Sequence, residues 1–227
     1  MNTLKALAAS VLFLISVSVA HANLLLNGDL ENNSAGTSVY NLLNEEFNGF
    51  VSGATAFGTA HEIDLYLNTV LAQSGDWMLG IHTSTNGNYD AFSLNLSSSI
   101  NAGTAYHLQF FGAGFDFPGF EDYPRFANIQ IGLSNNATDF GDLIFQAQVN
   151  SILTKEGWLQ YDYFFTATSG ATFLSVRTDP TMNGDPSGTY AFVDNFSINP
   201  VPEPSTMLLL GSGLIGLVGY GRRRFKK

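Results

Sequence analysis

The chain has 227 residues, a formal net charge of −10 at pH 7 and no cysteine. Six of its nine lysines and arginines lie in the first 22 or the last six residues. Three basic residues therefore face 19 acidic ones over residues 23–204, a net charge of −16. Such an acidic surface repels nucleic acid and anionic lipid and favours cations, although solubility alone also accounts for it. We expect no nucleic-acid partner, and a fold held together by core burial without disulfides.

The first 22 residues have the order of parts of a secretory signal peptide. Lys5 is followed by a short apolar run, and Ala20-His21-Ala22 has the small-x-small form of a cleavage site. An N-terminal anchor helix is the alternative, but the apolar run is short beside the roughly 20 residues that a membrane span needs. We expect residues 1–22 to form a signal helix that is removed, so that the mature chain begins at Asn23.

Residues 23–200 are expected to form one all-β domain, a single jelly-roll β-sandwich. Apolar and polar residues alternate over 92–97, 106–110 and 159–165, which is typical of strands with one buried face. Short apolar runs between turn-forming clusters predict further strands near 24–31, 61–67, 76–82, 126–133, 143–149, 171–177 and 190–198. Many short strands with turns between them indicate a sandwich or barrel. Residues 112–125 and 179–188 are predicted to be long loops, and 32–60 has no clear assignment.

The C-terminal 27 residues have three parts. Val201 is followed by Pro202, Glu203 and Pro204, then by an apolar run over 207–220, and then by a basic cluster. The cluster consists of Arg222, Arg223, Arg224, Lys226 and Lys227. The apolar run is shorter than a full span, yet a basic cluster beside it is typical of the cytoplasmic end of a membrane helix. We expect 207–220 to form an apolar helix that contacts the inner membrane transiently.

This order of Pro-Glu-Pro, apolar helix and terminal arginines resembles the PEP-CTERM sorting signal over residues 201–227. The resemblance implies that Pro202, Glu203, Pro204, Arg222, Arg223 and Arg224 belong to the signal. It also implies recognition by an exosortase-type enzyme in a Gram-negative bacterium. The protein would then be exported to the cell envelope, the cell surface or the extracellular matrix, among exported polysaccharide.

The mature domain resembles jelly-roll carbohydrate-binding and galactose-binding-like domains. The segment Asn23-Leu24-Leu25-Leu26-Asn27-Gly28-Asp29-Leu30-Glu31 is similar to their opening strand, and Tyr190-Ala191-Phe192-Val193-Asp194-Asn195-Phe196-Ser197-Ile198 is similar to their closing strand. These domains often hold a structural calcium ion between a glutamate of the first strand and an aspartate of the last. The resemblance therefore implies Glu31 and Asp194 as calcium ligands.

The alternation of the last strand gives a separate reason to expect a bound metal or a hydrogen-bonding partner at Asp194. If Phe192, Phe196 and Ile198 point inward, strict alternation places Asp194 on the same inward face. A buried carboxylate must be paired, hydrogen-bonded or bound to a metal, and basic partners are scarce in this domain. The alternative to calcium is a carboxylate that accepts hydrogen bonds from backbone N–H groups.

The aromatic stretch 115–123, within the predicted loop over 112–125, is the candidate for glycan binding. Phe117, Phe120 and Tyr123 lie there beside Asp122, and aromatic faces with neighbouring carboxylates can bind sugars. The alternative is that these rings cover one end of the core, since phenylalanine has no polar group.

The sequence contains no clear catalytic pattern. The histidines form no H-E-x-x-H motif, and no G-x-S-x-G motif is present. We predict a non-catalytic exported protein that is sorted by an exosortase-type system and associated with exopolysaccharide or biofilm. A carbohydrate-binding module with a defined glycan site is the alternative, and a hydrolase ranks third.

Overall fold

The computed structural model describes residues 23–114, 127–151, 153–181, 189–202 and 211–213, and Asn23–Asn199 form one compact unit. The elements of this unit are β1 (Val39–Leu42), α2 (Asn44–Phe50), β2 (Ala54–Ala56), β3 (Ile63–Leu67), β4 (Trp77–Thr83), β5 (Ala91–Ile100), β6 (Ala105–Gly114), β7 (Ala127–Ser134), β8 (Asp142–Val149), β9 (Leu159–Thr166), β10 (Ala171–Thr178) and β11 (Thr189–Pro200).

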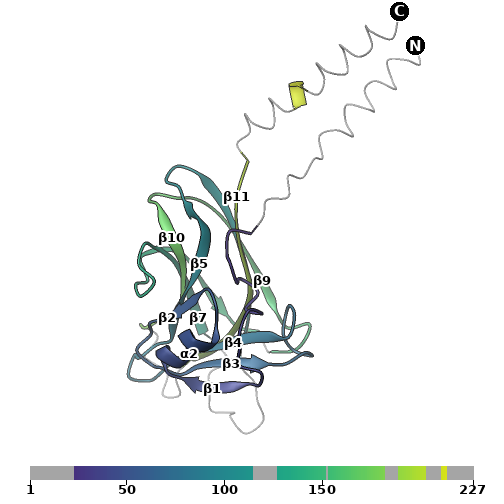
Figure 1. Ribbon diagram of the computed structural model, residues 1–227, viewed down its shortest axis with the longest axis vertical. Coiled ribbons are helices and arrows are strands. Elements are labelled where there is room, and N and C mark those ends of the chain that lie inside the picture. Colours follow the sequence, from purple (N-terminus) through teal and green to yellow (C-terminus); the bar gives the residue numbers. More distant parts are fainter. Residues whose placement is uncertain (1–22, 115–126, 152, 182–188, 203–210, 214–227) are drawn as a thin grey trace, which may run out of the picture. The chain divides into compact units, whose positions relative to one another are not determined.

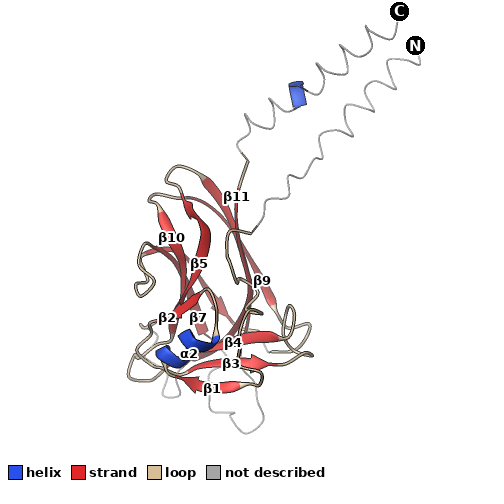
Figure 2. Cartoon of the chain, viewed as in Figure 1, coloured by secondary structure: helices blue, strands red, loops and turns tan. Residues whose placement is uncertain are grey.

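Two antiparallel sheets make up the unit. One sheet has the strand order β1-β3-β4-β11-β6-β9, and the other has the order β2-β5-β10-β7-β8. In Figure 1, β5 and β10 rise on one side of the unit and β9 and β11 on the other, and Figure 2 shows that strands dominate it. The prediction of an all-β jelly-roll sandwich is confirmed.

The buried faces of the two sheets enclose one large hydrophobic core. Phe110 lies at its centre, stacked on Tyr161 with ring centroids 4.9 Å apart and on Phe196 at 5.4 Å. Phe92 meets the Phe196 ring edge-on from the other sheet, at 6.2 Å. These contacts join β5, β6, β9 and β11, so the aromatic rings tie the two sheets together. A smaller cluster, comprising Met78, Ala113, Leu153 and Phe192, is separate from this core.

The predicted strand near 24–31 is wrong, because side chains there replace the hydrogen bonds of a strand ladder. Asn27 accepts from the N–H of Asn32 at 3.0 Å and donates to the carbonyl of Ser52 at 2.8 Å. The segment forms turns, with one isolated bridge from Leu25 to Leu96 of β5 and separate backbone hydrogen bonds to β11. Asparagine competes in this way with regular secondary structure. The other predicted strands all correspond to observed ones.

The unassigned region 32–60 contains β1, the short helix α2 and β2. In α2 only Phe47 is buried, so a helix of seven residues gives too little apolar periodicity to be recognised. A carboxylate oxygen of Glu46 accepts from the N–H of Leu43 at 3.0 Å and caps the first turn.

The two terminal segments fall mostly outside the described residues. The predicted signal peptide lies outside them entirely, and so does most of the predicted apolar helix over 207–220. No helix within the described part of the chain is long and apolar enough to cross a membrane.

Candidate functional site

Glu31 reaches from the N-terminal segment to the start of β4. Its Oε1 atom accepts hydrogen bonds from the backbone N–H groups of Asp76, at 3.0 Å, and Trp77, at 2.8 Å. The side chain packs so closely on Gly75 that a Cβ atom there would lie 2.3 Å from the Glu31 carboxyl carbon, and Gly75 has φ +56°. A glycine is therefore required where the loop passes under this carboxylate.

Asp194 reaches the same loop from the last strand. Its Oδ2 atom accepts from the N–H groups of Gln73, at 2.9 Å, and Ser74, at 3.1 Å, and its Oδ1 atom accepts from Asn195 at 2.6 Å. The Asn195 side chain adds a bond to Oε1 of Gln73 at 2.8 Å. The structure thus brings the two predicted metal ligands to one loop, residues 73–77, which both hold through backbone N–H groups.

The electrostatics of this junction are unfavourable to two ionised carboxylates. Asp194 is fully buried, and burial is the main reason that its pKa rises to about 7, with the neighbouring negative charge of Glu31 raising it further. Three backbone hydrogen bonds act in the opposite direction but do not offset the loss of hydration. A cation at this junction would relieve the same repulsion.

The alternation expected for β11 breaks beside Asp194. Ala191 and Val193 face the large core, and so do Phe196 and Ile198, so the period shifts by one residue between Val193 and Phe196. Asn195 lies at the shift with φ +51°, a conformation that asparagine tolerates better than most residues. Such a bulge turns the following side chains to the other face. Asp194 therefore shares the face of Phe192, which belongs to the smaller cluster, and not that of Phe196.

The residues at this junction fit a calcium ion in part. Both carboxylates converge on one loop, and Oε2 of Glu31 receives no hydrogen bond from a described residue. Within the described residues, however, no group of three or more His, Cys, Asp or Glu side chains could hold a metal. Because calcium takes six to eight oxygen ligands, Glu31 and Asp194 would have to be joined by backbone carbonyls and water. Calcium at this junction remains a prediction.

All but one of the other predicted site residues lie outside the described residues. Phe117, Phe120, Asp122 and Tyr123 lie outside the described residues, and so do Glu203, Pro204, Arg222, Arg223 and Arg224. Pro202 lies in the described extension that follows β11.

The outward face of the five-stranded sheet carries a polar network that the sequence analysis missed. Nε of Arg177 on β10 donates to Oε1 of Gln130 on β7 at 2.7 Å. Gln130 in turn donates to Oε1 of Gln146 on β8 at 3.1 Å, and Gln146 donates to Asp179 at 3.2 Å. We call Arg177, Gln130 and Gln146 the Arg177 face. The only available signal was that Arg177 is one of three basic residues in the domain.

Two aromatic rings hold the guanidinium group of this face. Its carbon lies 3.8 Å from the ring centroid of Phe140 and 5.5 Å from that of Tyr89. No described carboxylate forms an ion pair with Arg177, and only its Nε donates a hydrogen bond to a described residue. The remaining donors of this fixed, flat cation thus make no hydrogen bond to a described residue, although the side chain is partly buried.

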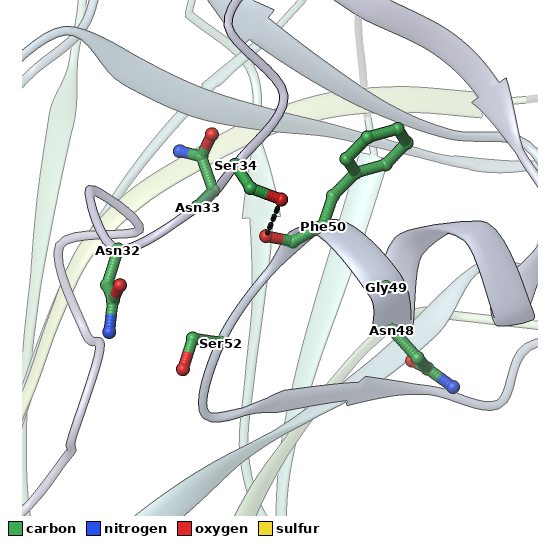
Figure 3. A pocket seen from close by; sticks show the side chains of 7 residues that line it. All are labelled: Asn32, Asn33, Ser34, Asn48, Gly49, Phe50 and Ser52. Atoms are coloured by element: carbon green, nitrogen blue, oxygen red, sulfur yellow. Dashed lines mark hydrogen bonds between the residues drawn. The ribbon is translucent and has the colours of Figure 1, made fainter.

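A polar hollow, separate from the Arg177 face, lies where α2 meets the N-terminal segment (Figure 3). It has a volume of about 350 Å³ and is lined by Asn32, Asn33, Ser34, Asn48, Gly49, Phe50 and Ser52. Part of this lining serves the fold: Oδ1 of Asn48 accepts from the N–H of Ala56 at 2.6 Å, and Asn33 donates to the carbonyl of Leu30 at 3.0 Å. The hollow has no charged side chain.

Comparison with known protein families identifies the C-terminal segment. A model of the PEP-CTERM protein-sorting motif matches residues 200–224. The chain carries a PEP-CTERM sorting motif. The prediction from Pro-Glu-Pro and the terminal arginines is therefore confirmed, and the motif indicates an exported protein of a Gram-negative envelope. No curated protein matches the chain.

Several solved structures resemble the sandwich that precedes this motif. TmCBM61, solved with β-1,4-galactotriose, is 13% identical, covering 79% of this chain and 99% of that one with a TM-score of 0.46. The CBM22-1 xylan-binding domain of Paenibacillus barcinonensis Xyn10C is 13% identical, covering 82% and 99%, with a TM-score of 0.43. The K3 adhesin domain of Lys-gingipain from Porphyromonas gingivalis is 11% identical, covering 79% and 98%, with a TM-score of 0.43. These likenesses are too distant to carry an argument about ligand.

The stability of the domain should fall as the pH rises. Burial raises the folded-state pKa of Asp194, and likewise that of Asp90, to about 7, whereas an unfolded aspartate ionises near 4. The folded state therefore binds more protons between these values, and each group lowers the free energy of unfolding by roughly 1.4 kcal/mol per pH unit there. Denaturant titrations at about pH 5 and pH 8 measure the difference. Asp194→Asn should remove about half of it.

Calcium bound at Asp194 should offset the part of this stability loss that comes from Asp194. At a hundredfold excess over Kd, an ion that binds only the folded state adds about 2.7 kcal/mol to the free energy of unfolding. Melting at pH 8 should therefore rise with calcium and fall with chelator in the parent, but not in Asp194→Asn. Equal melting of parent and variant with and without chelator would show that Asp194 acts only as a hydrogen-bond acceptor.

Proposed function

We propose that this chain is a non-catalytic, exported envelope protein whose sandwich binds a neutral glycan through the Arg177 face, in association with exopolysaccharide or biofilm. The observation that carries the proposal is the environment of the Arg177 guanidinium group. Its guanidinium group is fixed between Phe140 and Tyr89 and has no described carboxylate partner. In a domain with 19 acidic residues, an arginine left without such a partner is unusual.

The neighbours of Arg177 match the chemistry of sugar hydroxyl groups. The exposed amide of Gln146 provides a donor and an acceptor, and the buried Gln130, which accepts from Arg177 and donates to Gln146, fixes its position. Groups that are already ordered lose little conformational entropy when a ligand binds. Tyr89, which is half-buried, offers an aromatic surface beside them.

The charge of the domain favours a neutral glycan over an acidic one. Residues 23–204 carry a net charge of −16, so a polyanion meets long-range repulsion from nearly every direction. A neutral polysaccharide meets no such barrier, and one arginine supplies strong charge-assisted hydrogen bonds to its hydroxyl oxygens. The loop residues predicted for glycan binding, Phe117, Phe120, Asp122 and Tyr123, lie outside the described residues and are a separate candidate.

Arg177→Ala should weaken glycan binding by about 10- to 100-fold, the loss expected for hydrogen bonds to a charged group. The measurement is affinity electrophoresis of the exported protein in gels containing the exopolysaccharide of the producing strain. Xylan and β-1,4-galactan serve as neutral comparison polymers. Lys155→Ala is the matched control, because it removes the same charge elsewhere in the domain. Equal weakening by both variants, or none by Arg177→Ala, would contradict the proposed site.

We further propose that an exosortase-type enzyme recognises the C-terminal motif and that 207–220 contacts the inner membrane during sorting. The proposal rests on the match over residues 200–224, which contains the Pro-Glu-Pro sequence and the three arginines. Export to the envelope brings the sandwich to the place where exopolysaccharide is found, so sorting and glycan binding would serve one role.

Replacing Arg222, Arg223 and Arg224 with serine should leave export intact and disturb processing of the tail. The basic residues would hold the end of the apolar segment at the cytoplasmic face, and serine cannot do so. Intact-mass measurement of the protein recovered from the envelope gives its C-terminus. An identical mature C-terminus in parent and variant would show that the arginines are not part of the signal.

A further inference from the structure

A strip of polar and aromatic side chains lies on the outward face of the six-stranded sheet. It consists of His107 and Gln109 on β6 and of Gln160, Asp162 and Phe164 on β9. Their neighbours along both strands point into the core, so these five side chains point away from it. We call this set the β6/β9 strip. Phe164 is 65% exposed, a large apolar surface for a sheet face in contact with water.

The strip is ordered by contacts that centre on one carboxylate. Oδ1 of Asp162 lies 2.9 Å from Nε2 of His107 and accepts from Gln109 at 2.6 Å, while Oδ2 accepts from Gln160 at 3.0 Å. The His107 ring then stacks on Phe164, with centroids 4.2 Å apart and planes 3° from parallel. Asp162 fixes His107, and His107 fixes the Phe164 ring. This aromatic surface is therefore held in place before any ligand arrives.

The chemistry of the strip fits a neutral, extended glycan better than another protein. An exposed ring contacts the C–H faces of a sugar, and a carboxylate flanked by two amides offers acceptors and donors to its hydroxyl groups. A second copy of this chain would bring a further net charge of −16 to the same place, which opposes self-association. Asp162 opposes an acidic polymer in the same way.

The strip and the Arg177 face lie on opposite sides of the sandwich. The strip belongs to the sheet that contains β6 and β9, and the Arg177 face belongs to the sheet that contains β7, β8 and β10. The core between the two sheets separates them, so both surfaces can be occupied at once. Two ligand chains on opposite faces of one rigid domain are thereby linked to each other.

We infer that the β6/β9 strip is a second glycan-binding surface, and that one copy of the domain bridges two glycan chains. The inference rests on the proposed function, because it assumes that the Arg177 face binds the first chain. A bivalent domain gains avidity on a polymer that presents many copies of the same unit. In an extracellular matrix such a domain cross-links the polysaccharide instead of only coating it.

The test is a capture assay with the full-length exported protein and one purified polysaccharide. The producing strain's exopolysaccharide is immobilised, the protein is bound, and a fluorescently labelled soluble form of the same polymer is added. The parent should capture the labelled polymer. Phe164→Ala and Arg177→Ala should each still bind the immobilised polymer, on the order of 100-fold more weakly, and lose capture. Phe164→Tyr, which keeps the ring, should retain capture, and Leu143→Ala removes a comparably exposed apolar side chain as a control.

Each of the other outcomes would overturn a different part of the proposal. Unchanged capture by Phe164→Ala would overturn the strip as a binding surface and leave the proposed function intact. Complete loss of binding by Arg177→Ala alone would show a single glycan site and overturn the bridging. Capture that appears only at concentrations where sedimentation detects dimers would assign the bridging to two copies of the chain. If the parent binds no polysaccharide, the proposed function and the bridging both fail.

Discussion

The six-stranded sheet depends on two carboxylates that hold one loop through its backbone N–H groups. Glu31 comes from the N-terminal segment and Asp194 from the last strand, and both bind residues 73–77. This loop leads into β4, which lies between β3 and β11 in the sheet. Four N–H groups that no strand ladder satisfies thus find acceptors, three of them on buried or half-buried residues and one on the exposed Asp76. The carboxylates also fix where the chain enters and leaves the sandwich, since they lie near its two ends.

The scarcity of basic residues gives this junction and the Arg177 face opposite electrostatic properties. Among the described residues, Lys155 and Arg177 are the basic side chains of the domain, and neither pairs with Glu31 or Asp194. Burial therefore raises the pKa of Asp194 with no basic neighbour to lower it, and a cation from solution would be stabilised there. Arg177 meanwhile is held by rings and amides, so its charge is not neutralised internally. Among the described residues, Asp194 thus has no basic partner and Arg177 has no acidic one.

Much of the fold could be predicted because alternation of apolar and polar residues is a local property. Prediction from this alternation failed where a side chain or an unusual backbone conformation interrupted the hydrogen-bond ladder of a strand. Asn27 turned the predicted first strand into a series of turns, and Asn195 shifted the period of the last strand, so Asp194 was assigned to the wrong face. The candidate binding surfaces were harder to predict from the sequence, because the Arg177 face and the β6/β9 strip are assembled from strands distant in sequence. The sorting motif, by contrast, is linear and was recognised in full.

The most direct test of the hold that Glu31 and Asp194 have on residues 73–77 is amide hydrogen exchange measured by NMR at single residues. We predict that four amides within residues 73–77 exchange slowly in the parent, although three of them precede β4 and lie outside any strand. Asp194→Ala should accelerate the two at the start of this loop, and Glu31→Ala the two at its end, with the rest of the sandwich remaining protected. If these amides exchange in the parent as fast as those of an unstructured chain, the carboxylates do not hold the loop and the central claim is contradicted.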